Sequence, residues 1–101
     1  NVKVGEAFMV RTHPQWLKTL DVVRSGELGE VKSILGYFSF FLTDPDNIRN
    51  IPDFGGGAIL DIGCYPITTS RFIFGEEPTR AISLIDFDPE MKIDRLASII
   101  L

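Results

Sequence analysis

The sequence of 101 residues contains one cysteine and comparatively few positive charges. Cys64 alone cannot form an internal disulfide bond or a cysteine-based zinc site, which favours a reducing, cytoplasmic setting. Ten Lys and Arg residues against fourteen Asp and Glu residues give a net charge of −4. The positive residues are scattered singly, so we expect neither a nucleic-acid partner nor binding to an anionic membrane surface.

Long apolar runs are also absent. No stretch approaches the ~20 apolar residues that cross a bilayer, and the first residues lack the apolar region of a signal peptide. Hydrophobic residues nevertheless make up 45% of the chain, enough for one core. We therefore expect residues 1–101 to form one domain. Both ends interrupt apolar segments, which predicts a truncated domain of a longer protein; the alternative is a complete small domain whose last strand pairs within a sheet or a dimer.

Periodicity and turn residues predict an α+β fold, with helices packed on one face of a mostly antiparallel open sheet. Pro14 and Gly26 favour the start and the end of a first helix. Gly63 and Pro66 are expected to weaken or kink a second helix, and Gly36 indicates a bulge in a strand. The predicted strands are residues 2–10, 31–42, 79–87 and 93–101, and the predicted helices are residues 14–25 and 57–74.

Candidate metal ligands are sparse. His13 is the only histidine, and a single histidine cannot anchor a transition metal without several partners. Asp44 and Asp46 suggest the beginning of a calcium loop, but Arg49 and Gly55 occupy the positions where an EF-hand needs Gly and Glu. We expect no metal site in the chain.

The most informative stretch begins with three glycines, Gly55 to Gly57, which allow the backbone to approach a neighbour closely. Asp61 and Tyr65 follow, four residues apart, so a helix would present both on one face. A carboxylate beside a phenol suits proton transfer, although the phenol needs a cation from outside this helix to act as a base. Alternatively, the aspartate only favours the helix dipole and the tyrosine packs with its hydroxyl satisfied. The run matches neither a P-loop nor a dinucleotide fingerprint.

This stretch resembles the C-terminal, substrate-side domain of the glucose–fructose oxidoreductase, inositol dehydrogenase and MocA family. The specific part is Gly-Gly-Gly-Ala-Ile-Leu-Asp-Ile-Gly-Cys-Tyr-Pro, residues 55–66. Asn47-Ile48-Arg49 and the tyrosine variant are similar to the dihydrodiol and xylose dehydrogenase branch. Shorter matches lie at residues 6–15, 26–31 and 71–75.

The resemblance implies a parent oxidoreductase that moves a hydride between NAD or NADP and a sugar, polyol or related alcohol. Tyr65 and Asp61 match the catalytic positions. The missing parts are the N-terminal Rossmann domain and a Glu-Lys-Pro motif, so we expect the chain alone to be inactive and to bind no cofactor tightly. The predicted substrate-binding residues are Arg49, His13 and Arg11, and the predicted cofactor-binding residues are Gly56 and Gly57.

A second hypothesis is a non-catalytic module that mediates interaction or oligomerisation through its sheet, with Asp61 and Tyr65 only packing. In the parent both can hold, because the resemblance also implies a homo-oligomer formed through the sheet. Single residues have plainer alternatives as well. His13 would cap the first helix, Arg49 would be a solvated loop residue, and Cys64 would be a small buried thiol.

Overall fold

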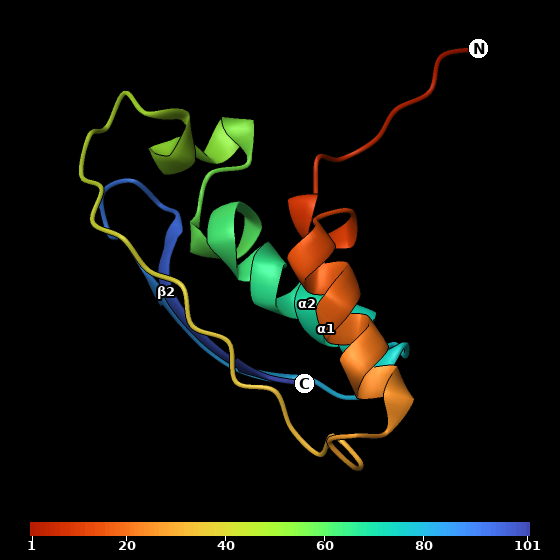
Figure 1. The fold of residues 1–101 in the computed structure, drawn as a ribbon. Coiled ribbons are helices and arrows are strands. Elements are labelled where there is room, and N and C mark those ends of the chain that lie inside the picture. Colours follow the sequence, from red (N-terminus) through yellow and green to blue (C-terminus); the bar gives the residue numbers. More distant parts are fainter.

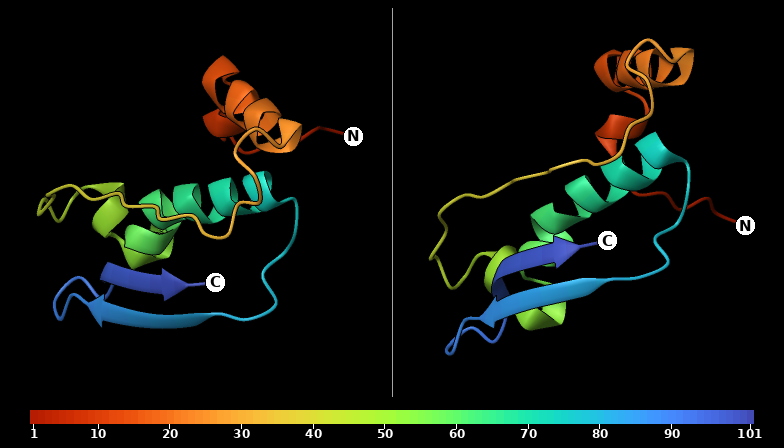
Figure 2. Two further views of the ribbon diagram at one scale, coloured as in Figure 1. Left: turned by 60° about the horizontal axis from the view of Figure 1, so that its bottom comes forward. Right: turned by 90° about the horizontal axis from the view of Figure 1, so that it is seen from below.

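The computed structural model describes all 101 residues and confirms the predicted α+β class (Figure 1). Two views show α1 packed on α2, and α2 lying between α1 and a β-hairpin (Figure 2). The helices thus lie to one side of the hairpin, and η4 is the part that contacts β2. The elements in chain order are η1 (Met9–Arg11), α1 (Pro14–Ser25), η2 (Ile48–Asn50), η3 (Pro52–Phe54), η4 (Ile59–Gly63), α2 (Cys64–Phe74), β1 (Ile82–Phe87) and β2 (Asp94–Ile100).

The first predicted helix is confirmed, with the expected residues at both ends. Pro14 stands in its first turn, where the missing N–H costs nothing. Gly26 ends it in the left-handed conformation, with φ 80°. Leu20 is the buried residue of this helix. Burying a leucine side chain contributes about 1.5–3 kcal/mol.

The second predicted helix is also present, and its expected irregularity takes the form of a wide π-helical turn, η4. There the N–H of Cys64 donates to the carbonyl of Ile59, five residues earlier. Pro66 has no N–H, and its ring crowds the carbonyl four residues before it, so a regular α-helix is disfavoured at this point. The continuous helical run through η4 and α2 ends at Gly75, with φ 71°.

The two C-terminal predicted strands are confirmed and form an antiparallel hairpin. Ile82 pairs with Ile100 at the open end, and a bulge lies between Asp86 and Phe87. The connecting turn is held by Asp88, whose Oδ1 accepts the N–H groups of Glu90 and Met91 at 2.9 Å. These two hydrogen bonds lower the pKa of Asp88.

The prediction of strands at residues 2–10 and 31–42 is wrong. Residues 1–8 lead away from the helices without joining a sheet (Figure 1). Residues 31–42 run extended beside α2 with no ladder partner (Figure 2). A strand needs the edge of another strand, and the hairpin pairs only with itself. Gly36 forms no bulge; it lets the segment cross α2, since a Cβ there would lie 2.6 Å from Cβ of Pro66.

Burial is uneven. The buried hydrophobic residues are Val10, Leu20 and Ile93, two from the helical side and one from the hairpin. Every residue of β1 is exposed. The core therefore sits around α1, η1 and α2, and the hairpin keeps an apolar surface in solvent. None of the helices combines the length and the apolar character needed to span a bilayer.

Candidate functional site

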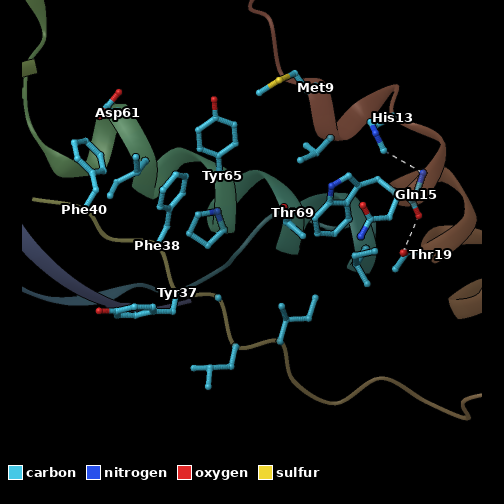
Figure 3. A pocket seen from close by; sticks show the side chains of 18 of the residues that line it. Met9, His13, Gln15, Thr19, Tyr37, Phe38, Phe40, Asp61, Tyr65 and Thr69 are labelled. Carbon is cyan, nitrogen blue, oxygen red and sulfur yellow. Dashed lines mark hydrogen bonds between the residues drawn. The ribbon is translucent and has the colours of Figure 1, made fainter. Parts of the chain in front are cut away.

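A cavity of about 970 Å³ lies between α1, the helical run of η4 and α2, and the extended segment 31–42. Its walls are mainly apolar and include Trp16 and Phe38, while Asp61, Tyr65 and Arg49 contribute polar groups. Figure 3 shows Asp61 and Tyr65 projecting to the same side of their helix. The predicted shared face is therefore present, although Asp61 stands in the π-helical turn and Tyr65 in α2.

The ring of Tyr65 is held by two aromatic neighbours. Its centroid lies 5.8 Å from that of Phe8, edge to face, and 5.9 Å from that of Phe38. No group of the chain hydrogen-bonds its hydroxyl, and the hydroxyl is not a buried orphan. The ring is packed, as the alternative interpretation states, and the hydroxyl has no partner within the chain. A catalytic role for Tyr65 stays a prediction.

Asp61 is paired with Arg49, which lies twelve residues earlier in the loop before the helix. The Nε atom of Arg49 donates to both carboxylate oxygens, at 3.0 and 3.1 Å. The aspartate side chain is 23% exposed and the arginine side chain 48% exposed. Arg49 is therefore not simply a solvated loop residue. It brings a cation to the site from outside the helix, although its direct partner is Asp61 and not Tyr65.

Contacts within the chain explain why glycines stand at positions 56 and 57. The N–H of Gly56 donates to the Ile51 carbonyl at 3.0 Å, and the N–H of Gly57 donates to the Arg49 carbonyl at 2.9 Å. A Cβ at Gly56 would lie 2.7 Å from the Arg49 carbonyl oxygen, and one at Gly57 would overlap the carboxylate of Asp94. Both N–H groups are thus hydrogen-bonded within the chain, and neither position has room for a side chain. Cofactor binding by Gly56 and Gly57 stays a prediction.

His13 caps α1, as its alternative interpretation states. Its Nδ1 accepts the N–H of Gln15 at 3.2 Å, and the residue also borders the cavity (Figure 3). Arg11 does not line the cavity; its guanidinium lies 5.8 Å from the centroid of the Phe72 ring. The structure therefore brings His13 to the cavity and leaves Arg11 outside it. Substrate binding by either residue stays a prediction.

Cys64 is half-buried next to Tyr65. Its thiol donates to the carbonyl oxygen of Asp61 at 3.6 Å. Burial raises the pKa of the thiol above its ordinary value. A raised pKa keeps the sulfur protonated and a poor nucleophile, in agreement with its interpretation as a packed thiol.

Sequence reasoning missed two contributions. Phe8 and Phe38 frame Tyr65, and nothing in the local pattern distinguishes them from other phenylalanines. Asp94 reaches the start of the helix from β2: its Oδ2 accepts the N–H of Ile59 at 2.6 Å, across 35 residues of chain. Helical spacing cannot reveal a contact between two different elements, so only the folded structure could show it.

Comparison with known proteins adds a family and several relatives. The GFO/IDH/MocA C-terminal domain family matches residues 16–101. An uncharacterized oxidoreductase of Rhizobium meliloti is 46% identical over 98% of this chain and 30% of its own length. The D-xylose 1-dehydrogenase (NADP(+)) 2 of Haloferax volcanii is 44% identical over 73% of this chain and 23% of its own. The trans-1,2-dihydrobenzene-1,2-diol dehydrogenase of Xenopus laevis is 32% identical over 100% of this chain and 30% of its own.

The matches cover most of this chain but only a small part of each relative. The chain spans at most 30% of the length of these three relatives. No solved structure matches it.

Proposed function

The chain belongs to the GFO/IDH/MocA C-terminal domain family, and from that premise we propose that it forms the substrate side of an NAD(P)-dependent oxidoreductase. The substrate is a sugar, a polyol or a related alcohol. The names of the relatives support this class, since they include a D-xylose dehydrogenase, a dihydrodiol dehydrogenase and a reductase of a dideoxy dTDP-glucose derivative. The observation that carries the proposal is the unengaged hydroxyl of Tyr65 beside Asp61 at the wall of one cavity.

Tyr65 is the proposed acid–base group. Its phenol hydroxyl can donate a proton to the oxygen of a carbonyl substrate. In the reverse direction it must accept a proton from an alcohol, which needs a nearby cation. The rings of Phe8 and Phe38 pack against the phenol ring and favour one orientation.

Asp61 is the proposed substrate-orienting group. Two hydrogen bonds from Arg49 fix its carboxylate, and a carboxylate oxygen has further lone pairs that accept a substrate hydroxyl. We keep Arg49 as a substrate-binding residue too, because its terminal nitrogens make no hydrogen bond within the chain and it borders the cavity. Such nitrogens suit an oxygen-rich ligand.

The cavity suits a nicotinamide ring and a sugar ring, because apolar walls face a few polar groups. The nicotinamide supplies or accepts the hydride when it is bound. The phosphates of a dinucleotide find no cradle of free N–H groups at Gly56 or Gly57. We therefore place the dinucleotide on a separate N-terminal Rossmann domain and expect residues 1–101 alone to be inactive.

The direct test compares the complete protein that contains this chain with residues 1–101 alone. We expect the complete protein to bind NAD or NADP in a fluorescence titration and to oxidise members of a panel of aldoses, polyols and diols. Residues 1–101 should do neither. A complete protein that binds neither dinucleotide would refute the proposal, and turnover by residues 1–101 alone would refute the division of labour.

The second candidate function, oligomerisation through the sheet, is favoured by the exposed face of the hairpin. Every side chain of β1 is exposed, including Leu84 at 79% and Ile82 at 67%. Contiguous apolar surface of this kind marks interaction sites. Sedimentation of the complete protein should show a homo-oligomer that Leu84→Lys dissociates. A monomer at all concentrations would exclude this candidate.

A further inference from the structure

Asp94, the first residue of β2, is joined to the beginning of the helical run that carries Asp61 and Tyr65. Its Oδ2 accepts the N–H of Ile59 at 2.6 Å, and the residue is half-buried, where water competes less with a hydrogen bond. From this geometry we propose that Asp94 is a positioning residue. Its carboxylate fixes the first turn of the helical run and thereby the direction of Asp61, two residues after Ile59.

The first turn needs an acceptor from outside. The first N–H groups of a helix have no partner within it, and a side-chain oxygen just before the helix usually accepts one of them. Here Ala58 and Gly57 stand at that place and have no such oxygen, and no local side chain caps η4. Asp94 supplies the missing acceptor from the hairpin, and its negative charge is favourable at the positive end of a helix dipole.

Gly57 makes room for this carboxylate. The glycine is buried and has φ +121°, a conformation that side chains rarely adopt. A Cβ at this position would overlap Oδ1 of Asp94 and lie 2.9 Å from its Cγ. The glycine N–H also binds the carbonyl of Arg49, whose side chain holds Asp61. Asp94 and Gly57 thus hold the loop that carries Arg49 and the helical run that carries Asp61. The side chains of these two residues form the ion pair.

The proposal rests on the proposed function for its catalytic consequence. Asp94 does not line the cavity that Tyr65 borders; it lines a second cavity, which Asp61 and Arg49 also reach. Its Oδ2 is engaged by the N–H of Ile59, so we assign its action to the helix and not to the substrate. A displaced Asp61 orients substrate poorly while the dinucleotide site on another domain stays intact. Loss of Asp94 should therefore lower kcat and leave the KM for the dinucleotide unchanged.

The experiment uses the complete protein with Asp94→Ala, Asp94→Asn and the control Asp86→Ala. Asp86 lies on the same hairpin, where its carboxylate accepts a hydrogen bond from Arg95 in an exposed ion pair. In Asp94→Ala we expect amide hydrogen exchange in residues 59–62 to accelerate by at least about tenfold, and kcat to fall by about tenfold. Asp94→Asn keeps an oxygen acceptor and should retain most of the wild-type exchange protection and most of the wild-type kcat. Asp86→Ala should change neither.

A second variant keeps the test informative if Asp94→Ala does not fold. Gly57→Ala should displace the carboxylate and accelerate exchange in the same residues. Its effect should shrink in the Asp94→Ala background, because the overlap is gone and only the backbone strain remains.

Two results would overturn the proposal: unchanged exchange in Asp94→Ala, or accelerated exchange with an unchanged kcat. If the wild-type protein shows no oxidoreductase activity, the proposed function fails on its own. In that case the exchange rates still decide whether Asp94 holds the turn.

Discussion

The two ends of the helical run through η4 and α2 are joined to the rest of the chain in different ways. At its beginning, Arg49 and Asp94 come from distant segments and hold Asp61 and the N–H of Ile59. At its end, Arg71 binds Glu77 only six residues later through two hydrogen bonds, at 2.7 and 2.5 Å. The aspartate side chain of the first ion pair is 23% exposed, and the glutamate side chain of the second is 71% exposed.

The comparison teaches that an arginine–carboxylate pair has no fixed meaning. The pair Arg71–Glu77 lies in solvent just after Gly75 ends the helix, and such exposed pairs add little to stability. The pair Arg49–Asp61 lies at the wall of a cavity, and in our proposal both of its side chains contact the substrate. Position and burial, more than bond geometry, separate a site residue from a surface contact.

Tyr65→Phe should have the largest effect at the beginning of the helical run. The variant keeps the ring contacts with Phe8 and Phe38 and loses only the hydroxyl, so stability should change little. In the complete protein we expect kcat to fall by about 10²- to 10⁴-fold, measured by dinucleotide absorbance under saturating substrate. Tyr37→Phe is the control for loss of a phenol hydroxyl elsewhere in the same cavity wall, where that hydroxyl accepts a bond from Ser39. Undiminished turnover in Tyr65→Phe would remove the phenol from the reaction.

Substituting Arg49 and Arg71 in separate variants tests the comparison most directly. Arg49→Gln should lower kcat/KM by about tenfold, because Asp61 loses the donor that orients it. Arg49→Lys should recover only part, since an ammonium is a point charge without the planar fork of a guanidinium. Arg71→Gln, at the other end, should change kcat/KM by less than about twofold. Equal losses in both variants would show that the two pairs are equivalent after all.

Local signals allowed prediction of α1 and of the shared face of Asp61 and Tyr65. Pro14, Gly26 and the four-residue spacing each act within one helix, so the sequence pattern is sufficient for them. The strand predicted at residues 31–42 failed for the opposite reason. Aromatic and β-branched residues indicate only that a segment suits a pleated surface, whereas a strand also needs a neighbouring edge. The Arg49–Asp61 pair and the Asp94 contact likewise depend on tertiary structure.

Cys64 offers a smaller test at the beginning of α2. Burial raises the pKa of its thiol, so any stabilisation from this group is present below the unfolded pKa of about 8.5 and is lost as the pH rises through the folded value. We expect iodoacetamide at pH 8 to label native Cys64 at least about tenfold more slowly than the protein unfolded in urea. Equal rates would show that the sulfur is freely reactive and that the turn before it is open.

The smallest effect should come from Glu77 at the far end. The hydrogen bonds from Arg71 lower the pKa of its carboxyl, so the stabilisation is present above the ordinary glutamate pKa of about 4.3 and disappears as the pH falls through the lowered folded value. Glu77→Gln should therefore reduce the loss of Tm between pH 7 and pH 3 only slightly, by about 2 °C or less for an exposed pair. Differential scanning fluorimetry over this pH range measures it. A larger effect would mean that the end of the helix depends on its ion pair as strongly as the beginning does, and the contrast between the two ends would then have to rest on catalysis alone.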